Sequence, residues 1–419
     1  MTAKTMLGLV LLLLLAWQGA GAQTLEMWTS SGEDRAYYQA MAERYREEID
    51  PDFALTVNAY GFQEMPDRLS VAIRTGQNTP DIVQLEENFL GIYLGEEQVP
   101  FADLSERVRE AGLGETIVEA RLELFSYGGA VYGIPQSLSA VVLYYRHDLF
   151  EERGVDAEDI ETWDDFVEVG QRLTGDRDGE YMIALDPSYW GILMRQRGVD
   201  AYDAEGNLQV SSDIAVDTLE WLVGLEEQGL ATEPPRGTIF DPPFLTQMLA
   251  GDQVLTVIGA DWFGLDFLRG ITPQMAGQWR AMPLPRWPDD PEGRRTSSFS
   301  GLGLLIFGDS PHTDEAWGFI EYVTTSTEAN VERYFGATSF TAYRPAWEDE
   351  RLYQPDDYFA GQSLAALLRE VADEVPVQHQ APGRARLLSL WNDSYWPAVI
   401  GGRQAPAEAL EALARDLQR

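Results

Sequence analysis

The sequence predicts an α/β protein built as two lobes, and three observations support this prediction. Segments with the pattern of buried strands alternate with amphipathic helical segments, which is typical of parallel sheets covered by helices. A polar turn followed by an apolar strand, well inside the chain, marks a place where one α/β unit ends and another begins. The 419 residues are enough for two or more lobes with sizeable cores.

The first part of the chain alternates between strand-like and helical segments. The helical segments carry apolar side chains on one face, as Tyr37, Met41 and Tyr45 do, and the strand-like segments are short and apolar. Together they form two βα units and a third strand, with predicted bounds of 24–28, 33–48, 53–60, 66–75 and 80–85.

The same alternation continues to the end of the chain. Thr162 and either Ser211 or Ser212 have the positions of helix N-caps, because apolar residues at helical spacing follow them. Buried strands are predicted at 182–185, 253–258 and 301–307, and an Ala-rich amphipathic helix at 406–417. In such a fold, ligands bind at the carboxyl ends of the strands.

The segment from Tyr132 to Phe150 is the most informative part of the chain. A turn at Gly133–Pro135 leads through Gln136 and Ser137 into an apolar, β-branched strand that ends at a polar cluster. A new helix starts soon afterwards, at Thr162. A buried strand entered through a polar pair is expected where a chain leaves one lobe for another, so this segment is predicted to be a hinge.

The composition is strongly acidic. The chain has 69 Asp and Glu against 30 Lys and Arg, a net charge of −39, which makes nucleic acid an unsuitable partner. The acids are spread among aromatic residues, which indicates a charged surface on a folded protein and not a disordered tail. The negative charges of such a surface repel one another in dilute buffer and are screened at molar salt, which favours a salt-adapted organism. The alternative is an ordinary acidic protein from a GC-rich genome, in which codon bias replaces Lys by Arg.

The N-terminus has the pattern of an export signal. Lys4 precedes an apolar core at 7–17, and Ala20-Gly-Ala22 resembles a cleavage site, so cleavage is expected near Ala22. The apolar run is too short to span a membrane. The absence of cysteine excludes disulfides, a Cys-based zinc site and a thiol nucleophile.

No motif in the sequence predicts catalysis. His147, His312 and His379 are far apart in the chain, which leaves a helical metal site unsupported, and the serine-hydrolase elbow, the dinucleotide fingerprint and the phosphate loop are all missing. Adjacent carboxylates at 86–87 and 164–165 could serve a glycosidase. With 69 acids such pairs also arise by chance, so a binding protein without metal or cofactor is predicted.

Several segments, in this order, resemble the family 1 extracellular solute-binding proteins of ABC importers, of the sugar-binding, maltodextrin-binding type. The Tyr132-Gly-Ile-Pro135 turn, a strand ending in Tyr144-Tyr145, and the helix start Thr162-Trp-Asp-Asp-Phe166 match that family. Weaker matches support the order at 25–45, 80–83, 261–262, 283–285, 301–306 and 316–323. The pair Arg146-His147 departs from it, because Asn-Lys is usual there.

The resemblance implies a type II periplasmic-binding-protein fold with the ligand cleft between two discontinuous lobes. The predicted division is 1–22 signal peptide, 23–136 plus 297–335 N-terminal lobe, and 137–296 plus 336–419 C-terminal lobe, with crossovers near 136–139, within 285–297 and near 336–338. The protein is expected to be a periplasmic monomer that delivers its ligand to ABC permease subunits. Without a cysteine for lipid attachment, it is not expected to be a lipoprotein.

Residues that follow predicted strands are the first candidates for ligand contact, because they should lie at the carboxyl edge of a sheet. Sugar recognition needs aromatic faces and convergent hydrogen-bonding groups. The candidates from this reasoning are Trp28, Ser30 and Ser31 after the first strand, Glu86 and Asn88 after the third, Gln136 and Ser137 in the hinge, and Ser300 and Gly301 on the return strand.

The resemblance adds a second group of candidates. In maltodextrin-type relatives an acidic-Pro-aromatic loop stacks on the sugar, and an aromatic residue after a later strand lies beneath it. The matching residues are Asp186, Tyr189 and Trp190 for the loop, Asp261 and Trp262 for the strand end, and Tyr343 and Arg344 near the third crossover. Trp391 in the C-terminal segment is a further candidate, with plain core packing as the alternative.

The predicted ligand is a mono- or oligosaccharide, captured by closure of the hinge. A glycerol-phosphate-like anion and a cationic polyamine remain alternatives, and a secreted glycoside hydrolase is the alternative from a different class of protein. The sequence does not choose among these ligands, because it does not show whether the cleft is basic, acidic or neutral.

Overall fold

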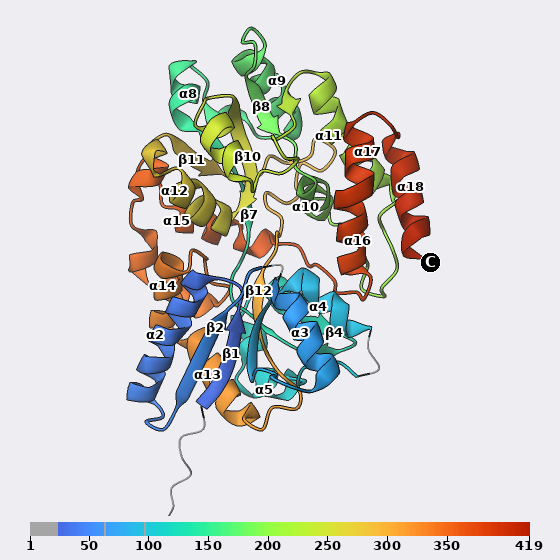
Figure 1. Cartoon of the computed structure of the whole chain (residues 1–419). Helices are drawn as coiled ribbons and strands as arrows, with labels where there is room; N and C mark the ends of the chain where they lie inside the picture. The colour runs from blue at the N-terminus through green and yellow to red at the C-terminus, as the bar shows by residue number, and fades with distance from the viewer. Residues whose placement is uncertain (1–23, 63, 96–97) are drawn as a thin grey trace, which may run out of the picture.

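The computed structural model describes residues 24–62, 64–95 and 98–419. The predicted signal segment and its cleavage site near Ala22 lie outside these residues. Figure 1 shows two α/β lobes stacked end to end, with the first strands in the lower lobe and the C-terminal helices beside the upper one. In the described part of the chain, helices fall short of the length and apolarity that a membrane span requires.

The N-terminal lobe contains a five-stranded sheet of order β2-β1-β3-β12-β6. Its strands are β1 (Thr24–Thr29), β2 (Ala54–Ala59), β3 (Ile82–Glu86), β6 (Ile134–Pro135) and β12 (Leu302–Ile306). The first three pair in parallel, whereas β12 runs antiparallel to both β3 and β6. A strand that returns from the other lobe therefore completes this sheet.

The C-terminal lobe contains the second five-stranded sheet, of order β11-β7-β10-β8-β9. Its strands are β7 (Val141–Arg146), β8 (Tyr181–Ala184), β9 (Ala231–Thr232), β10 (Val254–Ala260) and β11 (Trp279–Met282). Strand β8 pairs in parallel with β9 and β10, and β7 pairs antiparallel with β10 and β11. Both sheets are thus mixed, because the strands nearest the crossovers enter from the other lobe.

Helices cover both sheets. Those of the first part of the chain are α2 (Gly32–Glu48), α3 (Glu64–Thr75), α4 (Glu87–Leu94), α5 (Ser105–Glu110), α6 (Leu113–Thr116) and α7 (Glu119–Glu123), followed by the β4–β5 hairpin (Ser126–Tyr127, Ala130–Val131). Those of the middle are α8 (His147–Glu152), α9 (Trp163–Thr174), α10 (Ser188–Gln196), α11 (Asp213–Glu227) and α12 (Arg269–Ile271). The last are α13 (Thr313–Thr325), α14 (Thr327–Gly336), α15 (Leu364–Val371), α16 (Arg384–Leu390), α17 (Trp396–Ile400) and α18 (Pro406–Leu417).

Two predicted helix starts are confirmed by their cap geometry. Thr162 forms a capping box with Asp165 at the start of α9, and Ser212 caps α11 through the backbone amide of Ala215. Each cap satisfies amide groups that the first turn of a helix leaves without partners. Side-chain alternation in β1 divides the N-terminal core between the two faces of its sheet, with Met27 on one face and Trp28 on the other.

Three crossovers join the lobes and lie against one another. The amide of Leu138 donates to the carbonyl of Phe340 at 2.7 Å, and the amide of Val141 donates to the carbonyl of Ser297 at 3.0 Å. The stretch 283–297 packs on the C-terminal lobe, as the burial of Leu284 and Trp287 in its core shows. The second passage between lobes is therefore Ser298–Gly301, just beyond the predicted 285–297 stretch.

Each crossover contains one non-glycine residue with a left-handed backbone. These residues are Ser139 (φ 47°), Ser300 (φ 59°) and Thr338 (φ 51°). Such a conformation is uncommon outside glycine, and least favourable for a β-branched residue such as Thr338. The strain marks the three places where the chain changes direction between the lobes.

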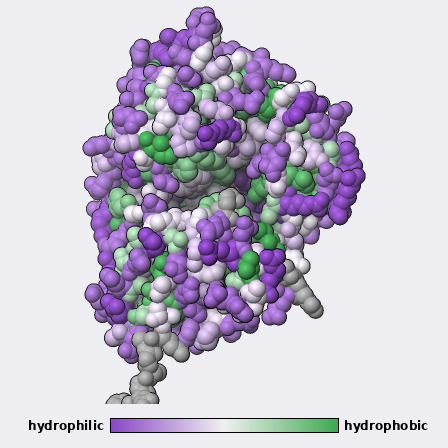
Figure 2. All heavy atoms as spheres, in the orientation of Figure 1, coloured by the Kyte–Doolittle hydropathy of each residue, from purple (hydrophilic) through white to green (hydrophobic). Residues whose placement is uncertain are grey.

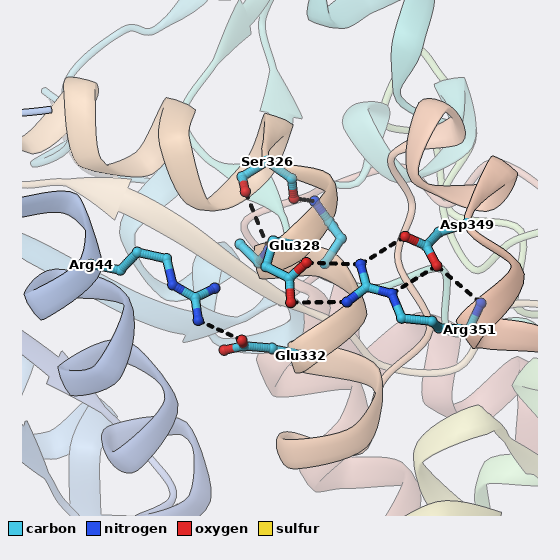
Figure 3. Close-up of polar contacts among 8 residues, drawn as sticks. Arg44, Ser326, Glu328, Glu332, Asp349 and Arg351 are labelled. Atoms are coloured by element: carbon cyan, nitrogen blue, oxygen red, sulfur yellow. Dashed lines mark hydrogen bonds and ion pairs between the residues drawn. The ribbon is translucent and has the colours of Figure 1, made fainter. Parts of the chain in front are cut away.

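A network of ion pairs surrounds α14, the helix that precedes the third crossover (Figure 3). Arg44 of α2 pairs with Glu332 of α14 at 2.6 Å, and Glu328 of α14 pairs with Arg351 at 2.8 Å. Arg351 also pairs with Asp349 at 2.7 Å, so the network runs from α2 through α14 to the 3₁₀ turn Glu350–Tyr353. These groups are partly exposed, so the energy of each pair is small.

Candidate ligand-binding site

The molecular surface is hollowed at the junction of the two lobes, as Figure 2 shows. The parallel strands β1, β2 and β3 end on the side of the N-terminal sheet that faces the other lobe (Figure 1). Ser30 and Ser31 follow β1 and are half-buried. Ser31 caps α2, since its hydroxyl accepts from the amide of Asp34 at 2.9 Å.

A polar group at the end of β3 joins three of the predicted site residues. One carboxylate oxygen of Glu86 accepts from the side-chain amide of Asn88 at 2.7 Å and from the hydroxyl of Ser300 at 3.0 Å. Burial, with the neighbouring carboxyl of Glu87, raises the pKa of Glu86 well above its usual range. Residues from the end of β3 and from the second crossover are thus held together. This agrees with the expectation that residues next to strand ends lie at one edge of the sheet.

Gln136 and Ser137 lie in the first crossover and are buried. The side chain of Gln136 accepts from the hydroxyl of Tyr38, and the hydroxyls of Ser137 and Ser139 are 2.8 Å apart. Gly301 lies directly against Arg121, and a Cβ at this position would overlap the guanidinium group. The crossover therefore has no room for any larger residue at 301.

An aromatic cluster lies in the C-terminal lobe beside the second crossover. Trp262 contacts Phe240, Phe267 and Phe299, with ring centroids 5.3 to 5.9 Å apart, and all four side chains are only partly buried. The indole N–H of Trp262 donates to the carbonyl of Phe299 at 3.2 Å. The segment after β10 was expected to be an exposed turn, but it is helical and Asp261 and Phe263 are buried; Trp262 is only partly buried, and the cluster can offer apolar faces to a ligand.

The sequence reasoning missed three members of that cluster, Phe240, Phe267 and Phe299. Phe299 could have been found, because it directly precedes Ser300, a residue that had been assigned to the return strand. Phe240 comes from a loop that is distant in sequence from β10, so no local pattern connects it to Trp262.

Asp261 is fully buried and links β10 to the third crossover. One of its carboxylate oxygens accepts from the amide of Phe340 at 2.7 Å, and the other has no hydrogen-bond partner among the described residues. Burial raises the pKa of this carboxyl to about 6, although Arg121 and Arg333 act in the opposite direction. Its neighbour in sequence, Trp262, is the better placed of the two to contact a ligand.

Four predicted pocket aromatics are core residues, and the structure contradicts their assignment to a pocket. Trp28, Tyr189, Trp190 and Trp391 are 0 to 4% exposed. The indole N–H groups of Trp190 and Trp391 donate to the carbonyls of Ala215 and Pro187, and their rings pack with centroids 4.4 Å apart and planes tilted by 35°. Tyr189 and Trp190 lie in α10 and Trp391 begins the π-helical turn Trp391–Tyr395 after α16, and all three belong to the C-terminal core, whereas Trp28 of β1 belongs to the N-terminal core.

Asp186 also has a structural position. Its carboxylate is buried and accepts four hydrogen bonds, from the amide and hydroxyl of Ser188, the hydroxyl of Thr238 and the amide of Ile239. The carboxylate thus fixes the start of α10 to the following loop, and no lone pair is directed at the cleft. The prediction that this residue contacts a ligand is contradicted by these contacts.

The two candidates near the third crossover lie apart from the polar group at β3. Tyr343 packs on the N-terminal core, and Arg344 pairs with Asp373 at 2.7 Å and lies over the ring of Trp347. An open groove of about 750 Å³ lies nearby between α2 and α14. None of the predicted site residues lines this groove.

Metal chemistry has no support in the described residues, where no three His, Asp or Glu side chains are placed to hold an ion. The arrangement consists of two α/β lobes, three crossovers, and polar and aromatic groups at their junction. This is the architecture of a protein that closes around a solute.

The comparisons with known proteins agree with this class. A family model described as bacterial extracellular solute-binding protein matches residues 28–330. The chain belongs to this family, as the sequence predicted. Its members are exported binding proteins and not enzymes, and the chain is therefore the solute-binding component of an ABC importer.

Curated relatives align over nearly the full length. The chain is 28% identical to an arabinooligosaccharide-binding protein of Halalkalibacterium halodurans, over 95% of this chain and 91% of that protein. It is 26% identical to an arabinooligosaccharide-binding protein of Bacillus subtilis, over 96% and 93%. A lactose-binding protein of Rhizobium radiobacter is 26% identical over 82% of this chain and 80% of its own length.

Solved structures confirm the two-lobed fold. An extracellular solute-binding protein of family 1 matches with a TM-score of 0.80 and 18% identity, over 94% of this chain and 98% of the other. The sugar-binding protein MalE of Xanthomonas citri matches with a TM-score of 0.77 and 18% identity, over 94% and 96%.

Proposed function

We propose that this protein captures a short oligosaccharide, with arabino-oligosaccharides as the first candidates, and delivers it to an ABC permease. The observation that carries the proposal is the alignment, over more than 90% of both chains, with two arabinooligosaccharide-binding proteins. Identities of 26 to 28% support the class of ligand and leave the particular sugar open.

The chemistry of the junction between the lobes supports a carbohydrate. Trp262 and its partly buried aromatic neighbours offer faces on which the apolar side of a sugar ring can stack. Asn88 and Ser300, which the buried carboxyl of Glu86 holds in place, offer donors and acceptors for hydroxyl groups. Ser30 and Ser31 supply further hydroxyls at the end of β1.

Capture proceeds by closure of the lobes about the three crossovers. A ligand that touches both lobes binds the closed form more tightly than the open form, so binding shifts the population toward closure. No covalent step is required, and the protein acts without catalysis.

The remaining sequence predictions stand as part of this proposal. The signal peptide ends near Ala22, and the mature protein is a periplasmic monomer without a lipid anchor. The predicted division, with 23–136 and 297–335 in the N-terminal lobe and 137–296 and 336–419 in the C-terminal lobe, is kept except at two places: Ser297 and Ser298 are bonded to the C-terminal lobe, and Ala342 and Tyr343 pack in the N-terminal core. The position of β12 in one sheet and of β7 in the other supports a division of this kind.

A thermal-shift panel at molar salt tests the ligand class. The panel contains arabinotriose, lactose, maltose, mannitol, glycerol 3-phosphate and spermidine, and a sugar present at 100 times its Kd should stabilise the folded protein by about 2.7 kcal/mol. A shift with the phosphate or the amine alone would refute the carbohydrate proposal. Release of free sugar from the oligosaccharides would refute the binding-only function.

A further inference from the structure

Two buried arginines, one from each lobe, hold the backbone of the crossovers. Arg121 extends from α7, which packs on β6 in the N-terminal lobe, and Arg195 extends from α10 in the C-terminal lobe. Their exposed fractions are 1% and 9%. Neither residue was predicted from the sequence, and neither is used by the ligand contacts described above.

Arg121 binds two crossovers from the N-terminal side. Its Nε donates to the carbonyl of Ser137 at 3.0 Å, and its Nη2 donates to the carbonyl of Ser300 at 2.9 Å. The planar guanidinium group can make both bonds at once because its N–H groups diverge in a fixed geometry. The amide of Gln136 bonds to the carbonyl of Leu302 at 2.9 Å, so this side of both crossovers belongs to the N-terminal sheet.

Arg195 binds the second crossover from the opposite side. Its Nε and Nη2 donate to the carbonyl of Ser298 at 3.3 and 2.8 Å. The hydroxyl of Ser297 donates to the carbonyl of Ile192 at 2.6 Å, and the hydroxyl of Thr296 donates to the carbonyl of Val141 at 2.7 Å. These contacts attach residues up to Ser298 to the C-terminal lobe.

Few residues remain between the two sets of contacts. They are Leu138 and Ser139 in the first crossover and Phe299 in the second, next to the left-handed Ser300. We expect a rotation of one lobe against the other to be taken up by the backbone torsions of these three residues, because neither arginine bonds to them. The contacts therefore define the axis about which the lobes can move.

The charges of the arginines are balanced locally. Burial lowers the pKa of Arg121 to about 10 and also lowers the pKa of Arg195; the charge of Arg195 acts in the same direction on Arg121, as the charge of Arg384 does on Arg195. Glu87 favours the charged form of both, Asp261 supports Arg121, and Asp200 lies 3.5 Å from Arg195. Both guanidinium groups therefore stay charged at neutral pH and keep donating to the carbonyls.

We propose that Arg121 and Arg195 are positioning residues for ligand capture, which attach each side of the crossovers to its own lobe and confine bending to Leu138, Ser139 and Phe299. This inference rests on the proposed function, in that capture requires closure of the lobes. When the lobes can rotate about only one axis, fewer of their relative orientations are lost as the ligand binds. The two arginines, which together form a clamp on the crossovers, therefore increase affinity without touching the ligand.

The experiment measures the hinge directly. The chain has no cysteine, so spin labels can be attached at chosen positions. Glu43→Cys on α2 and Glu220→Cys on α11 place one exposed labelling site in each lobe. Double electron–electron resonance then gives the distribution of distances between the lobes with and without arabinotriose, and calorimetry of the unlabelled protein gives the Kd. The clamp variants are Arg121→Lys, Arg195→Lys and Gly301→Ala, the last of which displaces the Arg121 guanidinium and keeps its charge.

Two control variants separate a hinge effect from general destabilisation. Arg146→Lys alters a buried, ion-paired arginine inside the C-terminal lobe. Gly303→Ala introduces a methyl group that overlaps the ring of Phe125 inside the N-terminal lobe. Both controls should lower the unfolding temperature and leave the distance distribution and the Kd as in the wild type.

The clamp variants should broaden the distance distribution of the ligand-free protein and weaken binding at least tenfold. Distributions and Kd values equal to the wild type in all three variants would overturn the proposal, as would equal broadening in the controls. If arabinotriose and the other sugars fail to bind the wild type, the proposed ligand class is wrong. The width of the ligand-free distribution still decides the role of the two arginines in that case.

Discussion

Replacement of Asp261 by Asn should make the protein more stable at neutral pH. The carboxyl is fully buried, one oxygen has no partner among the described residues, and burial raises its pKa from 3.8 to about 6. An amide in its place can still accept the 2.7 Å bond from the amide of Phe340. The substitution thus removes the charge and keeps the link to the third crossover.

The sign of the pH effect follows from the direction of the shift. A carboxyl with a raised pKa in the folded state holds its proton more tightly there than in the unfolded chain. Stability therefore falls as the pH rises from about 4 to about 6, and then levels off. A shift of this size corresponds to at most about 3 kcal/mol above pH 6, which is the gain expected for Asp261→Asn.

Urea unfolding of the wild type and the variant at pH 4, 5, 6 and 7 checks this prediction. The difference in unfolding free energy should be small at pH 4 and should grow until about pH 6. Asp52→Asn, at an exposed position, is the matched control for the loss of one negative charge. A difference that stays constant from pH 4 to 7 would refute the reasoning.

Three further predictions concern single side chains. Trp262→Ala should weaken sugar binding about tenfold and leave the unfolding midpoint nearly unchanged, since the ring is partly exposed; an unchanged Kd in calorimetry contradicts it. Trp391→Ala should instead cost about 3 to 5 kcal/mol of stability in urea unfolding, because the ring is buried against Trp190; a loss below about 1 kcal/mol would contradict its core position. Thr338→Gly should relieve the left-handed strain and raise stability by about 1 kcal/mol, and a lower midpoint would disprove that the backbone is strained there.

The sequence predicted the fold through two local signals, periodicity and helix caps. The capping box of Thr162 and the strand that follows Pro135 are defined by a few neighbouring residues, so their pattern is visible without a structure. The mixed character of the sheets was not visible, because the pairing of β12 with β3 and β6 joins segments that are distant in the chain.

The contacts among the candidate site residues were predicted in part. Glu86, Asn88 and Ser300 share hydrogen bonds because strand ends meet at one edge of a sheet, and this follows from topology alone. Trp28 was wrongly assigned to the pocket because the sequence does not show that both faces of β1 are covered by core residues. Tyr189 and Trp190 were misplaced because α10 is buried on more than one face, so exposure could not be inferred from helical spacing.

The long side chains at the crossovers were beyond sequence reasoning altogether. Arg121 bonds to a carbonyl 179 positions away, and Arg195 to one 103 positions away. An arginine in a helix has no local pattern that distinguishes a solvated charge from a buried one.

The place of β12 also determines when this protein can fold. The N-terminal sheet lacks the strand between β3 and β6 until residues 302–306 have been synthesised, after the whole β7–β11 sheet. Pairing between such distant segments is slow, because loop closure must precede the contacts that stabilise it. The N-terminal sheet, which contains the first strands to be made, is therefore completed only after the strands of the C-terminal sheet have been synthesised.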